Sequence, residues 1–413
     1  MENKKIITGI DIGTTKIAVV IAESSNDKCC ILGFGESPSH GLKKGIVVDM
    51  DQTIESLNTA LTEAEKQADI EIEEALVGIT GDHIKGINYS GVITISKNRN
   101  QQPLGQEIKR DDIKRVLDHA QTINLASDRR ILHVLSQDFK VDDRNGIKNP
   151  LGLAGHRLEA KVHLVTCSEN SSQNIHTCVR SCGLEVEAFV LEQLASSYSV
   201  LTNDERELGV CLVDIGCGTT DIAVFTEGSI SFTEVLPIAG DHVTNDIAQA
   251  LRTPPNQAED IKQMYGCAVS SLTSPKETMM VPGMGGRPER ELSRQSLADV
   301  LERRYVEIFS MTQQKLNISG FDSLIPAGIV LTGGASKIEG AVELAEEVFH
   351  TPVRIGTPNS AQGFSEIINN PIYATSVGLL EYGLKQKQED HMNYIHRDKN
   401  IFNRVSRWFG RNL

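Results

Sequence analysis

The feature of this sequence that most constrains its fold is an internal repeat. The segment "DIGTTKIAVV" begins at Asp11, and the segment "DIGCGTTDIAVF" begins at Asp214. Each follows a short apolar run and leads into a β-branched run, so each predicts a β-hairpin with a tight Gly/Thr turn. Because the two copies lie about half the chain apart, the repeat predicts two related lobes.

The other segments fit an α/β architecture. Residues 327–349 predict a strand, a Gly-Gly turn and a helix, and residues 370–384 have the helical apolar spacing of an element that closes the second lobe. Strands that alternate with helices indicate an α/β protein. Residues 87–162 instead contain strand-like pieces around one helix-like piece, which predicts an inserted α+β subdomain. Residues 253–304 predict a second insertion, with helices around a Pro/Gly-rich stretch.

Composition narrows the class of function. The chain has 413 residues, enough for more than one domain, and 39% of them are apolar. Its net charge of −14 disfavours nucleic acid as a partner, because proteins that bind nucleic acid usually carry a basic surface. The eight cysteines form no paired CxxC units, so we expect reduced thiols in a reducing cytoplasm. No uncharged apolar run reaches about 18 residues, so we expect no membrane-spanning helix.

The two hairpin turns predict a phosphate-binding site. A turn rich in Gly and Thr directs backbone N–H groups and hydroxyls toward one point, which suits an anion. Two such turns facing each other would hold the phosphate chain of a nucleotide from both sides. Asp11 and Asp214 begin the hairpins and suit Mg²⁺ held through water. The alternative is that each hairpin is only a tight turn. Two copies, with the Gly333–Gly334 turn at a strand-to-helix junction, favour nucleotide binding.

These motifs resemble the actin-like ATPase superfamily, which includes heat-shock chaperones and sugar kinases. The sequence has no P-loop and lacks the third glycine of a dinucleotide fingerprint. The resemblance implies two duplicated ATPase lobes that bind ATP and Mg²⁺. It assigns the nucleotide contacts to Asp11, Gly13, Thr14, Thr15, Lys16, Asp214, Gly216, Gly218, Thr219, Thr220, Gly240, Glu259, Lys262, Gly333, Gly334 and Ala335. Glu259 and Lys262 share one face of a predicted helix, and a surface ion pair is the alternative for them.

Two features of the sequence bear on the rate of ATP hydrolysis. Cys217 stands where the superfamily's second hairpin usually has a glycine, and a Cβ there would clash if the backbone needed a positive φ. Hydrolysis needs a group that orients water toward the terminal phosphate. By position, Glu192 is the candidate, with Gln193 the alternative, and either residue could instead lie on a helix surface. We therefore expect at most a slow ATPase.

Three segments narrow the resemblance to the FtsA family of bacterial cell-division proteins. They read "LASSYSVLTNDERELGVCLVDIG", "GIVLTGGASKIEG" and "GRPERELSRQSLADVLERRY", and the resemblance covers essentially the whole chain. In this family the usual second subdomain of the first actin lobe is absent, and a differently placed one is inserted. The resemblance implies a first lobe (1–86 and 163–192), an inserted subdomain (87–162), a second lobe (193–252 and 305–384), a second insertion (253–304), a linker (385–399) and a terminal amphipathic helix (400–413).

The last segment, "NIFNRVSRWFGRNL", predicts an interfacial membrane anchor. On a helix its apolar arc would comprise Ile401, Phe402, Val405, Trp408 and Phe409, opposite Arg404, Arg407 and Arg411. Its length of about 21 Å is too short for a membrane core of about 30 Å. We expect it to lie in the interface of anionic lipids after a flexible linker. The alternative is a terminal helix docked on the body of the protein.

The resemblance also implies partners. FtsA-like proteins bind the acidic–apolar C-terminal peptide of FtsZ on the second insertion, self-associate into actin-like filaments and hold later divisome proteins through the inserted subdomain. They act at the cytoplasmic face of the cell membrane, at the division septum. Arg304 in "ERRY" matches the family's peptide-contacting arginine, and Arg290 is a second candidate. Arginines suit carboxylates, although a solvated charged helix is the alternative. Rival functions are an actin-like sugar kinase, for which no general base is evident, and a pilus-assembly actin homologue.

Overall fold

Two five-stranded sheets of the same topology form the body of the protein. We describe a computed structural model over residues 5–25, 28–95, 105–358 and 361–386. The first sheet has the strand order β13-β6-β1-β2-β3, and the second has the order β16-β15-β14-β19-β20. In each sheet three strands form an antiparallel meander, and two more strands extend it in parallel. The duplicated α/β fold that the repeat predicted is confirmed.

The strands are short and mostly buried. Those of the first sheet are β1 (Lys5–Ile12), β2 (Lys16–Ser25), β3 (Lys28–Pro38), β6 (Glu74–Ile79) and β13 (Glu185–Leu191). Those of the second are β14 (Val210–Ile215), β15 (Thr220–Thr226), β16 (Ser229–Leu236), β19 (Ile329–Thr332) and β20 (Val353–Ile355). The central strands β14 and β19 are buried along their whole length, as expected for sheets covered on both faces.

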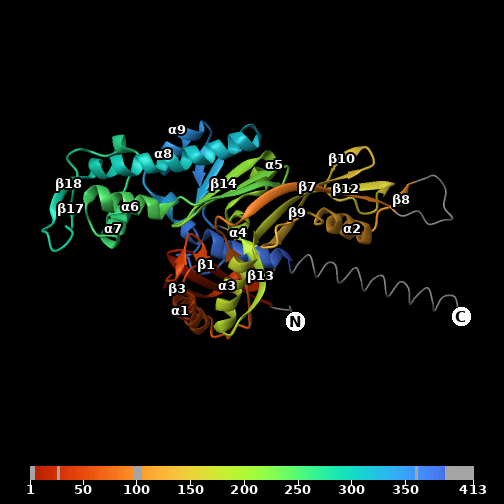
Figure 1. Ribbon diagram of the computed structural model, residues 1–413, viewed down its shortest axis with the longest axis horizontal. Coiled ribbons are helices and arrows are strands. Elements are labelled where there is room, and N and C mark those ends of the chain that lie inside the picture. The colour runs from red at the N-terminus through yellow and green to blue at the C-terminus, as the bar shows by residue number, and fades with distance from the viewer. Residues whose placement is uncertain (1–4, 26–27, 96–104, 359–360, 387–413) are drawn as a thin grey trace.

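Helices cover the outer faces of the two sheets (Figure 1). The first sheet carries α1 (Met50–Ala68) and α3 (Glu169–Ser181), whose apolar faces share a core with Ile10 and Val19. The second carries α6 (Gly240–Leu251), α8 (Arg294–Ser319) and α9 (Ala341–Phe349). Smaller elements are β4 (Leu42–Lys43), β5 (Ile46–Val47), α5 (Asn203–Leu208) and the 3₁₀ turns η1 (Ser270–Leu272), η2 (Asp322–Leu324), η3 (Gly334–Lys337) and η4 (Pro371–Tyr373).

Two further helices lie between the sheets. One is α4 (Glu192–Val200), and the other runs over residues 374–386. Their buried residues Leu194, Val377 and Leu380 share one cluster with Leu76 of the first sheet and Leu212 of the second. The two lobes therefore meet on a pair of helices rather than sheet against sheet, and this places both hairpin turns above the helices' N-terminal ends.

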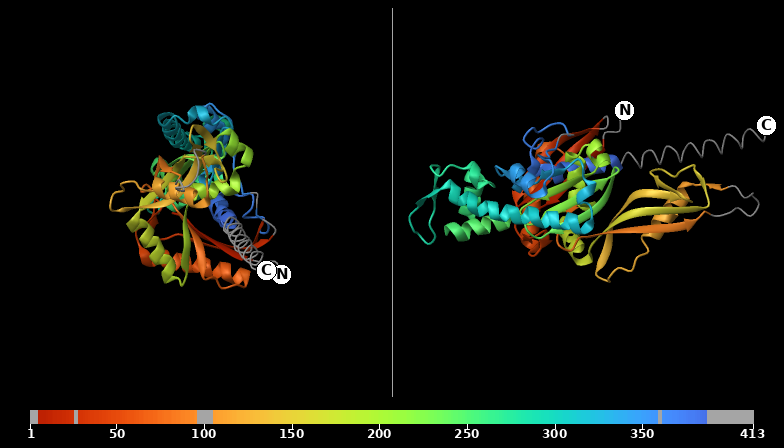
Figure 2. Two further views of the ribbon diagram at one scale, coloured as in Figure 1. Left: turned by 90° about the vertical axis from the view of Figure 1, so that its right-hand side faces the viewer. Right: turned by 90° about the horizontal axis from the view of Figure 1, so that it is seen from above.

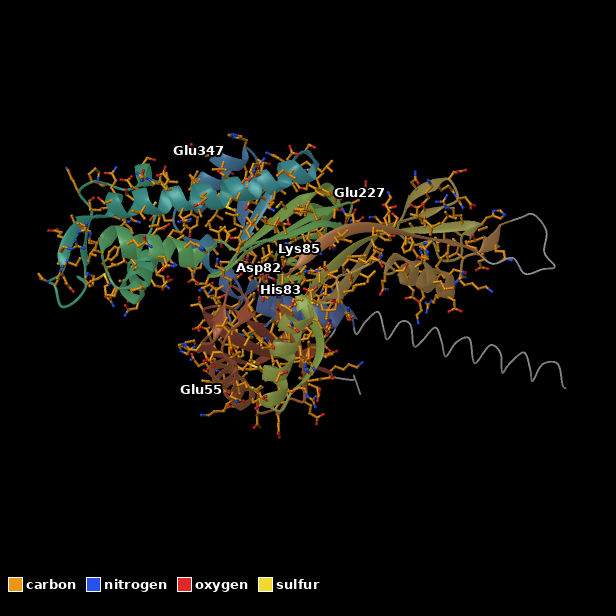
Figure 3. The ribbon with its side chains drawn as sticks, in the orientation of Figure 1. Glu55, Asp82, His83, Lys85, Glu227 and Glu347 are labelled. Atoms are coloured by element: carbon orange, nitrogen blue, oxygen red, sulfur yellow. The ribbon has the colours of Figure 1, made fainter. Side chains whose placement is uncertain are left out.

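The inserted subdomain is a four-stranded antiparallel sheet with one helix. Its strand order is β10-β9-β12-β7, with β7 (Lys85–Thr94), β9 (Arg129–Val141), β10 (Arg144–Ile147) and β12 (Arg157–Ser168). Helix α2 (Arg110–Ala120) packs on one face, and β8 (Gln106–Glu107) pairs with β11 (Ala154–Gly155). At its root, where Figure 3 labels Asp82, His83 and Lys85, the Arg129 guanidinium donates to the carbonyl oxygens of His83 (2.9 Å) and Thr166 (3.0 Å).

The second insertion lies at the other end of the long axis from the inserted subdomain (Figure 2). It contains α7 (Pro255–Tyr265) and the hairpin of β17 (Thr278–Val281) and β18 (Arg290–Ser293). It then leads into the long helix α8, which continues over the second lobe. The predicted domain limits at 86/87, 162/163, 192/193 and 304/305 fall inside β7, β12, α4 and α8, and they stay predictions.

No helix among the described residues is long and apolar enough to cross a bilayer. The predicted amphipathic helix over 400–413 and nearly all of the predicted linker lie outside the described residues. All eight cysteines lie within them and are free thiols.

Candidate functional site

The two repeat segments fold into hairpins with equivalent turns. Pairing of β1 with β2 ends at Ile12 and Ile17, and pairing of β14 with β15 ends at Ile215 and Thr220. Each turn is closed by one backbone bond: the Gly13 N–H donates to the Lys16 carbonyl (3.0 Å), and the Gly216 N–H donates to the Thr219 carbonyl (3.0 Å). The predicted hairpins are therefore confirmed, with turns of the same length.

The two turns face each other across the lobes. A Cβ built on Gly218 would lie 2.4 Å from the Thr14 hydroxyl oxygen and 3.0 Å from the Lys44 Cα. Only glycine fits at such a distance. The Thr14 hydroxyl also accepts a hydrogen bond from the Gly45 N–H (3.3 Å), so the loop between β4 and β5 adds a wall that the sequence did not indicate.

Helix α6 begins directly at the second hairpin. The N–H groups of Gly240 and Asp241 donate to the carbonyl oxygens of Gly216 (3.2 Å) and Cys217 (2.8 Å). The Cys217 thiol donates to the Asp241 carboxylate (2.6 Å), and burial raises the pKa of that thiol to about 12, so it stays protonated. Cys217 is not among the residues with positive φ, so the Cβ that replaces the usual glycine creates no backbone strain.

The Gly333–Gly334 turn closes the second lobe's side of the site. Gly333 has φ +84°, and a Cβ there would lie 2.3 Å from a carboxylate oxygen of Asp214. Two residues further along the chain, the Ala335 carbonyl accepts a hydrogen bond from the buried Tyr305 hydroxyl (2.8 Å). A Cβ on Gly240 would lie 3.6 Å from the Ala335 Cβ. The turn, the hairpin and the start of α6 therefore surround one space.

Glu259 and Lys262 form a partly buried ion pair beside this space. Their charged atoms are 2.6 Å apart, and Lys262 is 8% exposed. The Lys262 ammonium also donates to the Gly240 carbonyl (3.3 Å) and the Thr244 hydroxyl (2.8 Å). The buried Lys262 thus attaches the pair to α6, while the Glu259 side chain is 33% exposed. The ammonium of Lys16, in the first hairpin, lies 4.3 Å from the centre of the Tyr373 ring and 3.9 Å from Glu36, and its charge lowers the pKa of Asp11 and Asp214.

Four buried carboxyl groups lie beneath the turns: Asp11, Glu192, Asp214 and Asp221. Burial, together with neighbouring carboxylates, raises the pKa of each, to about 6 for Asp214 and about 7 for Asp221, while hydroxyl hydrogen bonds and the charge of Lys16 oppose part of the rise. So many acids cannot all ionise in a dry site without a cation. Among the described residues, no three His, Cys, Asp or Glu side chains are arranged to ligate an ion directly.

Hydroxyls from distant segments hold the aspartates, and the sequence analysis missed them. The Ser196 hydroxyl donates to Asp214 (2.5 Å), and the Ser376 hydroxyl donates to Asp11 (3.1 Å). Asp221, which was also missed as a site residue, accepts hydrogen bonds from Thr80 of the first lobe and Thr219 of the second. Since these partners are separated by up to 365 residues, no local signal marks them.

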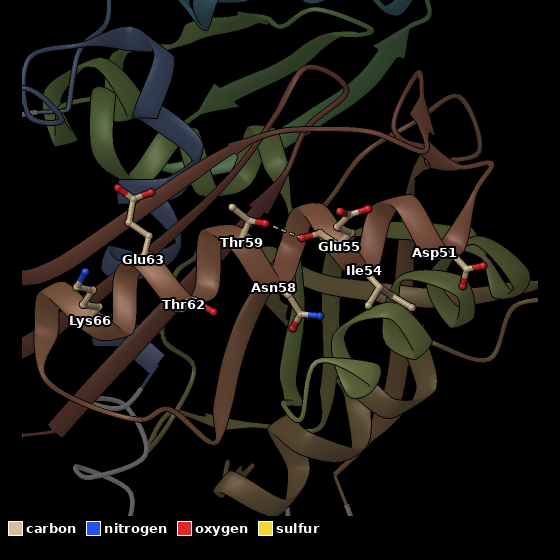
Figure 4. A pocket seen from close by; sticks show the side chains of 8 residues that line it. All are labelled: Asp51, Ile54, Glu55, Asn58, Thr59, Thr62, Glu63 and Lys66. Carbon is tan, nitrogen blue, oxygen red and sulfur yellow. Dashed lines mark hydrogen bonds between the residues drawn. The ribbon is translucent and has the colours of Figure 1, made fainter.

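Thr15 lies in the first turn and hydrogen-bonds to Cys217 of the second, whereas the predicted partner-binding residues lie away from this space. Arg304 on α8 binds Asp246 of α6, and Arg290 donates to the Leu251 carbonyl at the end of α6. The predicted membrane residues lie outside the described part of the chain. An open groove of about 730 Å³ follows α1, lined by Asp51, Ile54, Glu55, Asn58, Thr59, Thr62, Glu63 and Lys66 (Figure 4). All of these residues belong to one helix and none to a hairpin, so the groove is separate from the candidate site.

Solved structures share this fold. The chain resembles a structure titled PilM-PilN type IV pilus biogenesis complex, with a TM-score of 0.65, 15% identity, and coverage of 92% of this chain and 98% of the other. It also resembles MreB5 of Spiroplasma citri bound to ADP, with a TM-score of 0.56, 15% identity, and coverage of 93% and 98%. At such identities the likeness concerns the fold alone.

Two lobes of one topology, with facing Gly/Thr hairpins above a pair of crossing helices, define an actin-like protein. Sequence comparison is more specific. Residues 211–378 match the family "Cell division protein FtsA", and residues 81–166 match "SHS2 domain inserted in FTSA". The chain is 55% identical to the cell division protein FtsA of Pseudomonas aeruginosa (95% of this chain, 92% of the relative) and 42% identical to that of Escherichia coli K12 (99% and 97%). It belongs to the FtsA family of actin-like cell-division proteins.

Proposed function

We propose that this chain is an ATP-binding scaffold that attaches FtsZ polymers to the inner face of the cytoplasmic membrane at the division septum. The observation that carries the nucleotide part is the approach of Gly218 to Thr14, which brings two anion-binding turns together at the start of α6. Solved MreB5 structures are titled as bound to ADP and to AMPPNP, which supports a nucleotide in the corresponding place.

The residues present also fit Mg²⁺. Asp11 and Asp214 are buried carboxyls on opposite lobes. Ser376 donates to Asp11, whereas Ser196 and Thr375 both donate to Asp214. The positive charge of Lys16 also favours the ionised form of both. We propose that they hold Mg²⁺ through water, as carboxylates commonly do beside phosphates. When bound, the ion would neutralise phosphate charge. The protein's part is to keep the two carboxylates in place and shielded from bulk solvent.

We propose Glu192 as the residue that orients water for a slow hydrolysis. It begins α4, is 9% exposed, and interacts electrostatically with Asp11, Asp214 and Asp221. Burial, the largest cause, raises its pKa, which favours a group that can take up a proton. Gln193, the alternative, is fully buried, and its amide atoms have no hydrogen-bond partner among the described residues.

Calorimetric titration with ATP tests the nucleotide site. With Mg²⁺ present, Asp214→Asn should weaken ATP binding at least about tenfold, because one buried charge that faces the ion is lost. Without Mg²⁺ the variant and the wild type should differ little. Asp260→Asn, an exposed carboxylate on α7, is the matched control. If Asp214→Asn and the wild type bind ATP with equal affinity in the presence of Mg²⁺, the proposed metal site is wrong.

We propose that residues 400–413 anchor the protein in anionic membranes. Each arginine near an anionic surface contributes about 1 kcal/mol, and partial burial of the large apolar residues adds to this. One anchor is therefore weak, and self-association into filaments makes attachment firm through multivalency. The protein ending at residue 399 should stay in the supernatant with anionic liposomes while it still binds ATP. If the truncated protein pellets like the full chain, the anchor lies elsewhere.

The FtsZ partner is proposed to bind the second insertion at Arg304, with Arg290 nearby, and the inserted subdomain is proposed to recruit later divisome proteins. An acidic–apolar peptide with the character of the FtsZ C-terminus should bind the wild type in fluorescence anisotropy. Arg304→Ala should weaken binding, whereas Arg303→Ala, which removes the same charge from the exposed neighbouring position, should weaken it much less. Equal losses would indicate general charge attraction and not a specific contact.

A further inference from the structure

The guanidinium of Arg304 binds two carboxylates of its own chain. Its Nε and one terminal nitrogen donate to the two oxygens of Asp246 at 2.6 and 2.9 Å, and its other terminal nitrogen donates to Glu307 at 2.6 Å. The contact to Asp246 is the planar two-bond arrangement that arginine makes with a carboxylate. It joins α8 to α6, across 58 residues of sequence.

The two carboxylates are not equivalent. Glu307 is one turn further along α8, makes a single contact and is half-exposed, as in an ordinary surface pair. Asp246 comes from another helix and takes up the Nε edge, one of the two edges of the guanidinium that can bind both oxygens of a carboxylate. Glu307 holds one nitrogen of the other edge. A second carboxylate cannot occupy the Nε edge while Asp246 holds it.

We propose that Asp246 is an intramolecular competitor for Arg304, so that an acidic partner can bind the Nε edge of the arginine only by replacing Asp246. The inference rests on the proposed function, in which Arg304 receives an acidic peptide. It adds Asp246 as a residue that sets the affinity of the site for the partner without itself binding the partner.

The exchange is structurally feasible. The Arg304 side chain is 22% exposed and the Asp246 side chain 29% exposed, so water can reach both groups as they separate. Solvent access weakens such a pair, although its two-bond geometry makes it stronger than most surface pairs. The helices themselves do not depend on the pair, because Val243 and Ile247 of α6 pack with Leu301 and Tyr305 of α8 in the core of the second lobe. Loss of the Asp246 charge should therefore leave α6 in place.

The test measures the anisotropy of a labelled acidic–apolar peptide and of the same peptide with its acids changed to amides. Asp246→Asn keeps the shape of the side chain but gives up the charge. It should bind the acidic peptide about two- to fivefold more tightly, as expected when a solvent-accessible competing pair is removed. It should bind the amide peptide as the wild type does. Asp260→Asn controls for the change in net charge and should give a clearly smaller gain. Asp246→Ser is a second variant, should Asp246→Asn unfold at a lower temperature.

The outcomes separate the inference from the proposed function. If wild-type binding depends on Arg304 but neither Asp246 variant binds more tightly, the inference is overturned, and Asp246 instead orients Arg304. If the acidic peptide binds Asp246→Asn but hardly binds the wild type, the competition is stronger than expected and the inference stands. If the peptide binds neither protein, the proposed partner site fails, and the competitor role fails with it.

Discussion

Gly378 packs directly against the carbonyl oxygen of Ala195, so that the helix over 374–386 crosses α4 with no side chain between them. A Cβ built on Gly378 would lie 1.9 Å from that oxygen. Close to this crossing, Ser196 of α4 donates to Asp214 and Ser376 of the other helix donates to Asp11. The closeness of the crossing therefore fixes both serines relative to the aspartates of both lobes.

Substitution of Gly378 should separate the crossing helices. Gly378→Ala adds a methyl group that clashes with the Ala195 carbonyl oxygen, and forcing extra volume into a packed core costs about 1–3 kcal/mol. We expect the free energy of unfolding to fall by about that amount in urea unfolding followed by circular dichroism. Gly334→Ala, whose Cβ would meet only the Ile372 side chain at 3.7 Å, should leave stability nearly unchanged. A Gly378→Ala protein as stable as the wild type would show that the crossing can open freely.

The pH at which metal-dependent nucleotide binding is lost should depend on Ser196. Burial raises the pKa of Asp214 to about 6, and the Ser196 hydrogen bond opposes that rise. Mg²⁺ needs the ionised carboxylate, so Mg²⁺-dependent ATP affinity should decline as the pH falls below about 6. Ser196→Ala removes the opposing bond, raises the pKa of Asp214 further, and should move this decline to higher pH. Calorimetric titrations between pH 5 and 8 measure it.

Ser199→Ala is the matched control, because the Ser199 hydroxyl donates to the carbonyls of Ser196 and Ala374 and contacts no aspartate. Identical pH midpoints in Ser196→Ala and Ser199→Ala would mean that Asp214 does not control metal binding.

Cys217 should tolerate replacement by serine better than by glycine. Its φ is not positive, so glycine offers no relief of strain there and adds freedom to the unfolded chain, at a cost of about 0.4–1 kcal/mol. Cys217→Gly also loses the hydrogen bond to Asp241, whereas a serine hydroxyl can make it. Urea unfolding should rank Cys217→Gly below Cys217→Ser. The opposite order would show that the turn favours the glycine common in the superfamily.

The repeat predicted the hairpins correctly because strand, Gly/Thr turn and strand are local features. Sequence similarity alone, however, aligns "TTKIAV" with "TTDIAV", so that Asp221 is matched to Lys16. In the fold the closing hydrogen bonds align Lys16 with Thr219, and Asp221 lies in a strand directly opposite Asp214. The backbone hydrogen bonds that close the two turns therefore give the correct alignment. In this alignment Asp221 is an additional acid of the site and has no counterpart in Lys16.

Contacts between segments far apart in the sequence were beyond prediction from sequence alone. Ser196 and Ser376 stand in small-residue stretches that suit any buried helix. Arg304 was expected to be free for a partner because a sequence lists charges without their partners. Its bond to Asp246 arises only when α6 and α8 pack together. The site residues that were predicted carry a local backbone signature, and those that were missed act through tertiary contacts.

Acid should destabilise the protein partly through His163, at the contact between the inserted subdomain and the second lobe. The ring is 1% exposed, one nitrogen is 2.7 Å from the Asn88 side-chain oxygen, and the other is 2.8 Å from the Thr233 hydroxyl of β16. Burial lowers the pKa of His163 to about 4, against about 6.5 in the unfolded chain, so the unfolded state takes up the proton first as the pH falls. From pH 7 to 5 this costs about 2 kcal/mol of unfolding free energy. His163→Gln cannot take up the proton, so its stability should fall less over that range, while His176→Gln on α3 should follow the wild type. If His163→Gln and the wild type lose stability in parallel, His163 is not the acid-sensitive group.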